Sequence, residues 1–254
     1  MVLQRAHLLT ILLLGCAAPD PGRTLLIGHG GLGPSGTYPM DSREALFGAL
    51  ESGMHGVELD AQLTGDGVIV AFHDLEVTCG TAFDGPIHGK TWRELQACSG
   101  EQNGATLFRL DEGLPAAVQE HPDAAFTLDV KLNTRNDWWT YLRSFAAALK
   151  ALHETDRLRD RLLVECRTED FLKLLHEEVP ELPLYYYCDE AETGIQKALQ
   201  LGCSGITIHT DHIDAAQVEE AHAAGLYVTV FGVSGTWGLE RALQKNVDRI
   251  QLDQ

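Results

Sequence analysis

Eight short apolar runs alternate with segments of helical pattern along almost the whole chain. The runs are rich in aliphatic and β-branched residues and are bounded by turn residues, which is typical of buried strands. They cover residues 25–31, 56–64, 126–132, 162–167, 182–188, 205–210, 226–233 and 248–253. Strands that alternate with helices form parallel sheets, and a set of eight fits a closed barrel. The sequence therefore predicts an α/β protein with a (β/α)8 TIM-barrel fold.

Capping residues mark where two of the intervening helices begin. Asp41 and Glu44 have the spacing of a capping box for a helix over 42–52, and Gly53 is its stop. Asp214 can cap a second helix later in the chain. Both caps follow a predicted strand, as the barrel requires.

Two features depart from an ideal barrel. Residues 68–104 hold an extra strand over 68–72 and a loop-rich insertion after the second barrel strand. No eighth helix is evident after the last predicted strand. A chain of 254 residues with 44% hydrophobic residues suits one large barrel or two small domains, and no Pro/Gly/Ser-rich linker divides it. One barrel domain is therefore predicted over 24–254.

Residues 1–15 are predicted to form a signal peptide. The apolar run over 8–14 is too short for the roughly 20 residues that span a bilayer, but it suits a signal-peptide core. The run ends in Leu13-Leu14-Gly15-Cys16, which resembles the bacterial lipobox, whose cysteine becomes the lipidated first residue. We therefore expect an exported bacterial lipoprotein, on the periplasmic side or cell surface, tethered through Cys16 and residues 16–23. Ordinary signal cleavage nearby is the alternative.

The acidic composition limits the partners. The formal net charge is −18, whereas binding to a phosphate backbone requires a basic face, so nucleic acid is not expected. The same charge disfavours adhesion to anionic lipid. The expected partner is a small-molecule or lysolipid substrate, with membrane contact only through the lipid anchor. The sequence sets no oligomeric state.

Five cysteines lie beyond the lipobox. Cys79 and Cys98 flank a loop-like segment and form the candidate disulfide, because export permits oxidation. The alternative is that these two cysteines remain reduced. The others lie in or beside apolar runs and are predicted to be buried small residues: Cys166, Cys188 and Cys203. The sequence has no Cys-x-x-Cys pair, which gives a zinc or redox site little support.

Polar groups stand at the ends of several apolar runs, where buried strands would emerge from the core. The early ones are Gly28-His29-Gly30-Gly31, Pro39-Met40-Asp41-Ser42, Val57-Glu58-Leu59-Asp60 and Phe72-His73-Asp74. A barrel places its chemistry at the carboxyl ends of its strands. The candidate functional residues therefore gather at one end of the predicted barrel.

The order and spacing of these groups resemble the glycerophosphodiester phosphodiesterase family, whose pattern runs His-Arg-Gly, Pro-Glu-Asn-Thr, Glu-x-Asp and His-Asp. Asp129-Val130-Lys131 stands where the family has Glu-x-Lys, and residues 224–231 stand where it has a Gly-Leu-x-Val strand. Residues 246–253 match its terminal motif imperfectly. The resemblance covers nearly the whole mature chain, with His-Gly-Gly in place of His-Arg-Gly. It implies a TIM barrel with an insertion after the second strand.

Carboxylates at the predicted mouth point to a metal ion. Residues two apart on a strand share a face, so Glu58 and Asp60 point inward together, and Asp129 and Lys131 do the same. Converging carboxylates repel one another unless a cation neutralises them, and hard oxygen ligands suit Mg²⁺ or Ca²⁺. The resemblance assigns the positions of Glu58, Asp60 and Asp129 to one divalent cation. An ion-pair lattice with Lys131 and an arginine is the alternative.

Two histidines are the candidates for proton transfer. His29 and His73 follow apolar strands in matching motif positions, and histidine titrates near neutral pH without special help. The resemblance implies that one is the base, acting on water or on a neighbouring substrate hydroxyl, and that the other protonates the leaving alcohol. The sequence does not assign which does which.

The largest departure from the family pattern is Gly30, where the family has an arginine that grips the phosphate. We expect Arg167 to supply that contact, with Glu165 positioning it, because the two share one face of the fourth strand. A surface ion pair at a helix start is the alternative. Lys131 is expected to stabilise charge on the phosphoryl oxygens, and Phe231 to line the leaving-group pocket.

Taken with the resemblance, these residues predict metal-dependent hydrolysis of glycerophosphodiesters to glycerol 3-phosphate and an alcohol. One alternative is a lysophospholipase D-type phosphodiesterase acting on lipid substrates. The other is a catalytically inactive barrel that binds a ligand. The presence of both histidines, the carboxylates and Lys131 argues against the inactive barrel.

Overall fold

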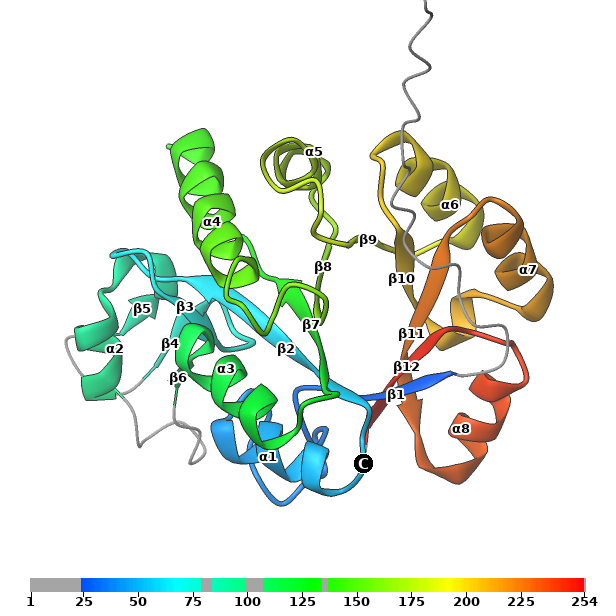
Figure 1. The fold of residues 1–254 in the computed structure, drawn as a ribbon, viewed down its shortest axis with the longest axis horizontal. Coiled ribbons are helices and arrows are strands. Elements are labelled where there is room, and N and C mark those ends of the chain that lie inside the picture. Colours follow the sequence, from blue (N-terminus) through cyan, green and yellow to red (C-terminus); the bar gives the residue numbers. More distant parts are fainter. Residues whose placement is uncertain (1–23, 79–83, 99–106, 134–136, 254) are drawn as a thin grey trace, which may run out of the picture.

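The computed structural model describes residues 24–78, 84–98, 107–133 and 137–253. The parallel strands β1 and β2 pair with each other, and β1 also pairs with the last strand, which closes a ring of eight. The ring consists of β1 (Leu25–Gly28), β2 (Gly56–Leu63), β7 (Ala125–Val130), β8 (Leu162–Cys166), β9 (Leu184–Cys188), β10 (Gly205–His209), β11 (Tyr227–Ser234) and β12 (Arg249–Asp253). Figure 1 shows the helices arranged around it. The predicted (β/α)8 TIM barrel is confirmed.

Apart from α2, which belongs to the extension after β2, the helices connect successive barrel strands and bury one face against the barrel. They are α1 (Arg43–Glu51), α2 (Trp92–Cys98), α3 (Leu110–Glu120), α4 (Trp138–His153), α5 (Glu169–Glu178), α6 (Ala191–Gln200), α7 (Ala215–Ala223) and α8 (Gly235–Leu243), with short 3-10 turns at Ile87–Gly89 and Thr210–His212. In α5, for example, Phe171, Leu172 and Leu175 are buried while Glu169 begins the exposed face. Among the described residues no helix follows β12. Nor is any helix in the described ranges both long and apolar enough to cross a bilayer.

An extra layer extends the barrel after β2. The end of β2 pairs antiparallel with β3 (Ile69–Ala71), and β3 pairs with β6 (Phe108–Arg109). A small hairpin of β4 (Glu76–Val77) and β5 (Gly85–Pro86) lies beside them and shares an apolar cluster with α2. The Phe72 N–H donates to the Asp60 carbonyl at 2.9 Å, so the chain leaving β3 returns to the barrel mouth. This extension carries His73 to the level of the β2 carboxylates.

The two predicted helix caps have different outcomes. In α7, Asp214 and Gln217 form a capping box in which each side chain accepts a backbone N–H of the other, as predicted for Asp214. In α1 the prediction was wrong, because the cap is Ser42, whose hydroxyl accepts the Ala45 N–H at 3.1 Å. Asp41 instead adopts a left-handed conformation with φ 59°, which an aspartate tolerates better than most residues. Its carboxylate is thereby free to turn toward the barrel mouth.

Successive side chains along each barrel strand point alternately outward, toward the helices, and inward, toward the barrel axis. Residues on the outer face, such as Leu59, Leu128 and Ile208, are fully buried against the helices. The inner face is more polar and includes Thr127 and Gln251, both buried. This arrangement follows from the period of two in a strand. The barrel axis therefore offers hydrogen-bonding side chains that can hold charged groups at the mouth.

The cysteines that the structure describes are structural. They are free and buried: Cys166, Cys188 and Cys203. This confirms their prediction as small buried residues. The candidate disulfide between Cys79 and Cys98 lies outside the described side chains, as do the predicted signal peptide and the tether over 16–23.

Candidate active site

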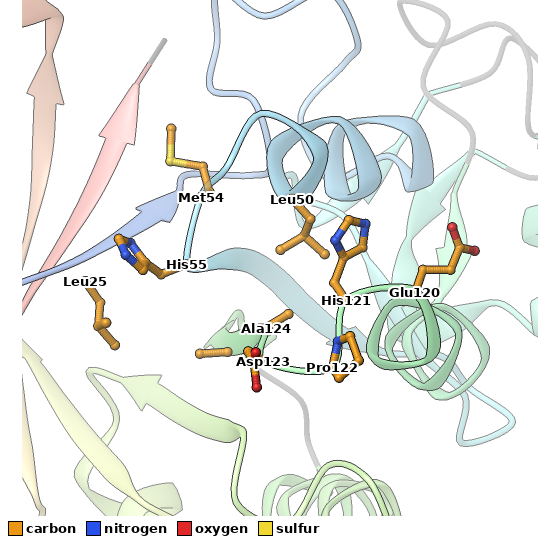
Figure 2. Close-up of a pocket in the computed structure, with 10 residues that line it drawn as sticks. Leu25, Leu50, Met54, His55, Glu120, His121, Pro122, Asp123 and Ala124 are labelled. Carbon is orange, nitrogen blue, oxygen red and sulfur yellow. The ribbon is translucent and has the colours of Figure 1, made fainter.

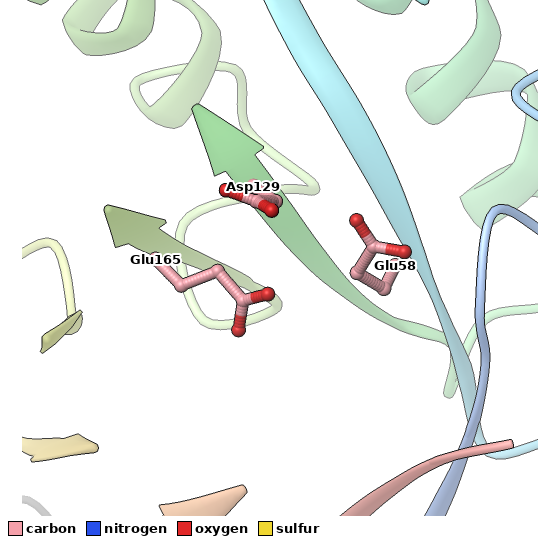
Figure 3. Close-up of side chains that lie close together, drawn as sticks. All are labelled: Glu58, Asp129 and Glu165. Atoms are coloured by element: carbon pink, nitrogen blue, oxygen red, sulfur yellow. The ribbon is translucent and has the colours of Figure 1, made fainter. Parts of the chain in front are cut away.

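The barrel register brings four carboxylates to one level of the mouth or just below it. Asp60 of β2 is paired with Asp129 of β7, and Asp129 is paired with Glu165 of β8. Glu58 lies two residues before Asp60 and shares its inward face. Oxygen atoms of Glu58, Asp129 and Glu165 all lie within 4.8 Å of one another, and Figure 3 shows the three side chains converging. The carboxylates thus form a compact cluster inside the mouth.

Burial makes this cluster electrostatically costly. Glu58 and Glu165 are each only 1% exposed. Burial, reinforced by the charges of the neighbouring carboxylates, raises the pKa of Glu58 well above its ordinary value. Burial together with the Asp129 charge raises the pKa of Glu165 to about 7. Burial also raises the pKa of Asp129, although Lys131 opposes that rise. Such a group of acids is most stable with a cation at its centre.

Hydrogen bonds from other parts of the barrel fix the orientation of two members of the cluster. Glu165 accepts one bond from the Thr207 hydroxyl at 2.7 Å and one from Gln251 Nε2 at 2.8 Å. Glu58 Oε2 accepts the backbone N–H of Gly30 at 2.9 Å. Donors of this kind hold metal-ligating side chains in place.

Lys131 sits between two of the acids. Its Nζ lies 2.6 Å from Asp129 Oδ2 and 2.8 Å from Asp60 Oδ1. Burial lowers the pKa of Lys131, but the two carboxylates outweigh that effect and raise it above its ordinary value. Of the trio expected to bind metal, Glu58 and Asp129 lie together with Glu165, while Asp60 lies beside them against Lys131.

The expected pairing of Glu165 with Arg167 is not formed. Both Glu165 oxygens accept bonds from Thr207 and Gln251, so Glu165 belongs to the carboxylate cluster rather than to the arginine. The Arg167 guanidinium stacks over the Tyr187 ring at 4.4 Å and lies 3.6 Å from Asp189. Its position at the rim therefore depends on β9 and not on its own strand.

His29 is oriented by the last strand. Its Nδ1 lies 2.7 Å from Asp253 Oδ1, and its Nε2 lies 3.9 Å from Glu58 Oε2. Burial lowers the pKa of His29, but the Asp253 hydrogen bond and nearby carboxylate charges outweigh this and raise the pKa overall. Asp253 was not among the predicted site residues. The parallel pairing of β1 with β12 makes them neighbours, and the terminal motif was the one signal for it.

His73 lies at the rim. Its Nδ1 is 2.9 Å from Asp74 Oδ1, and both side chains are exposed. His73 and Asp74 line a pocket of about 430 Å³ that also includes Asp129, Lys131 and Arg167. His29 and His73 therefore approach the cluster from different walls of the mouth.

Phe231 stands in an aromatic wall on the other side of Arg167. It stacks on Tyr187 with ring centroids 5.2 Å apart and meets the His209 ring edge-on at 5.3 Å. Tyr187 in turn carries the Arg167 guanidinium. The wall is thus continuous across the ends of β8 to β11.

A further acid of the mouth is Asp41, which lies in one of the motif groups of the sequence but was predicted only as a helix cap. It is 4% exposed, and its Oδ1 accepts the Asp60 backbone N–H at 2.9 Å. Its Oδ2 is buried with no hydrogen-bond partner in the described part of the chain. Burial, with the Asp60 and Glu58 charges adding to it, raises the pKa of Asp41 well above its ordinary value. The local sequence fits a helix cap at Asp41, and for that reason the place of its carboxylate in the barrel mouth was not predicted.

Fold and site together define a barrel with an acidic, histidine-flanked mouth. The model of the glycerophosphoryl diester phosphodiesterase family matches residues 32–253, and the chain belongs to that family. The match begins just after His29 and includes His73 and the carboxylates.

Relatives of known sequence cover part of the chain. It is 30% identical over 167 residues to a glycerophosphodiester phosphodiesterase of Bacillus altitudinis, a match that covers 63% of this chain and 65% of the relative. It is 34% identical over 156 residues to the YqiK protein of Bacillus subtilis, covering 59% and 61%. The matched part therefore spans less than two thirds of either relative.

Solved structures share the fold. A glycerophosphodiester phosphodiesterase from Parabacteroides distasonis superposes with a TM-score of 0.76 at 21% identity, covering 91% of this chain and 92% of that one. A phosphodiesterase from Oleispira antarctica, solved with its product sn-glycerol-3-phosphate, gives 0.75 at 24% identity, covering 90% and 92%. These likenesses extend the barrel assignment across nearly the whole described chain.

Proposed function

We propose that the protein is a divalent-metal-dependent phosphodiesterase that hydrolyses glycerophosphodiesters to glycerol 3-phosphate and an alcohol. The observation that carries this proposal is the buried cluster of Glu58, Asp129 and Glu165, with oxygens within 4.8 Å of one another. A cluster of this kind at the mouth of a family barrel is suited to chemistry on a charged substrate. The named Bacillus altitudinis relative and the product-bound Oleispira antarctica structure give the proposal its substrate class.

The donor set fits a hard cation such as Mg²⁺ or Ca²⁺. Glu58, Asp129 and Glu165 would hold it, since all three are carboxylates and hard divalent ions prefer oxygen ligands. Asp60 is close enough to the same level to contribute, although it is paired with Lys131 here. When bound, the ion would supply charge stabilisation to the phosphoryl oxygens.

The two histidines have the geometry for proton transfer. Asp253 holds Nδ1 of His29, which leaves Nε2 facing the cluster, and Asp74 pairs with Nδ1 of His73. One histidine takes the proton of the attacking hydroxyl as its oxygen bonds to phosphorus. The other gives a proton to the leaving alcohol as the old P–O bond breaks. The attacking hydroxyl belongs to water, or to the neighbouring carbon of the substrate, in which case the product is a cyclic phosphate that water opens in a second step to give glycerol 3-phosphate.

The family pattern has an arginine at the position of Gly30. We propose that Arg167 contacts the phosphate in place of that arginine. It lines the same pocket as Lys131, Asp129 and His73, and its side chain is 60% exposed. Lys131 is held between two carboxylates, so Arg167 has more freedom to meet an anion. A guanidinium can grip a phosphate with two parallel hydrogen bonds.

The decisive experiment measures glycerol 3-phosphate released from glycerophosphocholine by a soluble form starting after Cys16. The assay contains Mg²⁺, Ca²⁺ or EDTA and includes His29→Ala and Glu58→Gln. Release that requires a divalent ion and is lost in both variants is expected. No glycerol 3-phosphate from this diester and no lysophosphatidic acid from lysophospholipids, with either ion, would favour the inactive ligand-binding barrel instead.

We also propose that the protein is exported and anchored through Cys16. The support is the apolar run that ends in Leu13-Leu14-Gly15-Cys16. The full chain should incorporate labelled fatty acid in a bacterial host and fractionate with membranes. A Cys16→Ser variant should lose the label, and an unlabelled full chain would contradict the anchor.

A further inference from the structure

A second pocket of about 520 Å³ opens beside His73 and Asp74, which it shares with the Arg167 pocket. Its remaining walls come mainly from the loop between β1 and α1. Tyr38, Met40 and Phe72 line it, so two aromatic rings and a thioether face this space. Tyr38 is 44% exposed, which places its ring at the open rim.

The charges of the two pockets differ. Lys131 and Arg167 line the first pocket, whereas none of the described residues lining the second is Lys or Arg. Asp74 lines both pockets, Asp129 also lines the first, and Asp41 lines the second. Asp41 is almost fully buried, and its Oδ2 has no hydrogen-bond partner among the described residues. An aromatic pocket without basic residues thus adjoins a pocket of mixed charge across His73.

Gly30 lies against Met40, one of the residues that line this pocket. A Cβ built on Gly30, whose φ is +53°, would lie 2.5 Å from Met40 Cε and 2.8 Å from Met40 Cβ. Positions 30 and 40 therefore touch, and in the family pattern they hold an arginine and a glutamate. In this chain both charged residues are replaced together, by a glycine and an apolar side chain.

We propose, on the basis of the function inferred above, that this pocket binds a quaternary ammonium group on the leaving alcohol of the diester. Aromatic rings attract such a cation through their π faces, and its methyl groups also pack on apolar walls. The exposed carboxylate of Asp74 adds attraction that a neutral hydrocarbon group would not gain. A zwitterionic diester would then place its phosphate by Arg167 and its cation by Tyr38 and Phe72.

Three esters of sn-glycerol 3-phosphate distinguish the effect of the charge of the leaving alcohol from the effect of its shape. The same product is measured for all three. Their alcohols are choline, its neutral isostere 3,3-dimethylbutanol, and glycerol, and each releases glycerol 3-phosphate. We expect kcat/KM for the choline ester to exceed that for the dimethylbutyl ester by about fivefold, the size of a cation–π contact at a partly exposed ring. If the kcat/KM values for the choline and dimethylbutyl esters lay within about twofold of each other, the proposal would be overturned, because the pocket would not distinguish a cation from a neutral group of the same shape.

Two variants place the effect in this pocket. Met40→Lys adds a cation there and should lower kcat/KM for the choline ester about tenfold more than for the dimethylbutyl ester. Leu199→Lys is the matched control, because Leu199 is 49% exposed near the end of α6 and outside both pockets. Tyr38→Ala should also reduce the preference for choline without adding a charge.

Equal losses on all three esters in Met40→Lys, with no change of preference in Tyr38→Ala, would remove the pocket from substrate recognition. Absence of glycerol 3-phosphate from every ester would contradict the proposed hydrolysis itself, and the inference with it. The two failures are therefore distinguishable.

Discussion

The two ends of the barrel treat polar groups differently. At the floor, where the strands begin, carboxylate and histidine side chains pair locally, although Arg249 Nη1 is buried there without a hydrogen-bond partner among the described residues: His55 Nδ1 accepts the Leu26 N–H, and Asp248 accepts the Val228 N–H while pairing with His222. At the mouth, like charges face one another, and Asp41 and Asp60 each retain a buried oxygen with no hydrogen-bond partner in the described ranges. The floor is therefore organised for stability, and the mouth is organised for binding.

Pocket size does not follow this division. The floor holds a pocket of about 600 Å³ between the starts of β1 and β7, which Figure 2 shows with His55 and His121 at its sides. The mouth pocket beside Arg167 measures about 430 Å³. Only the smaller one adjoins the carboxylate cluster. Unneutralised charge is thus a better guide to the site than volume.

Breaking the mouth cluster should have the largest effect. Glu58→Gln keeps the side-chain volume but removes a buried charge, so hydrolysis of glycerophosphocholine should fall by about a thousandfold or more as metal stabilisation is lost. The same variant should unfold at a higher temperature than the parent in EDTA, because it removes repulsion from Asp129 and Glu165. Steady-state kinetics and thermal unfolding measure the two effects. A Glu58→Gln enzyme with parental turnover would show that the cluster is structural.

The pH dependence of stability sharpens the same contrast. The pKa of Glu165 is raised to about 7 from an ordinary 4.5, so the folded protein holds a proton that the unfolded chain has released. The metal-free protein should therefore lose up to about 3 kcal/mol of stability as the pH rises from about 4.5 to about 7. Urea unfolding in EDTA at pH 5, 6 and 8 measures this loss.

Glu165→Gln is the control for that measurement, because it should reduce the pH dependence of stability and leave the part that comes from the raised pKa values of Glu58, Asp129 and Asp41. Addition of a divalent ion at pH 8 should restore stability to the parent, since binding to the folded state alone stabilises it. Stability that rises between pH 5 and pH 8 in EDTA would contradict the raised pKa.

Sequence periodicity was enough to predict the barrel and most of its mouth. Alternation of apolar runs and helices set the strand order, and the period of two placed Glu58, Asp60, Asp129 and Lys131 inward. The period of two along a strand predicts the face on which a side chain lies. It does not predict which side chain from another strand will contact it across the barrel. Glu165 was accordingly assigned to Arg167 on its own strand, whereas strand register and the Thr207 and Gln251 donors place it in the cluster.

The other two differences arise from contacts that are distant in sequence. Asp253 reaches His29 because closure of the barrel makes the first and last strands neighbours. Asp41 was read as a cap because Asp and Ser are both good N-caps, and the local pattern does not choose between them. The left-handed turn at Asp41 decides the choice in favour of Ser42.

The Asp253–His29 pair predicts an intermediate effect. Asp253→Asn should lower kcat about tenfold to a hundredfold, the usual cost of losing a residue that orients a functional histidine. It should also shift the pH limb governed by His29 to lower pH, because the Asp253 carboxylate raises the pKa of His29. A pH–rate profile measures both changes. An unshifted limb with reduced kcat would mean that Asp253 serves only the fold.

Arg167 predicts a smaller effect at the rim. Arg167→Ala should raise KM for glycerophosphocholine by about tenfold or more, the size of one charged hydrogen bond. Arg167→Lys should recover only part of this loss, because a lysine keeps the charge but not the planar pair of donors. If kcat and KM were unchanged in Arg167→Ala, the proposal that Arg167 contacts the phosphate would be wrong.

The floor should give the smallest response. His121 lines the large pocket there, remote from the carboxylate cluster at the opposite ends of the strands. His121→Ala should therefore leave kcat/KM unchanged and alter stability by no more than about 0.5 kcal/mol, as for most substitutions away from cores and networks. Parallel assays with Glu58→Gln provide the contrast. If His121→Ala reduced turnover without unfolding the protein, the floor pocket would be coupled to the mouth, and the separation of a stabilising end from a binding end would fail.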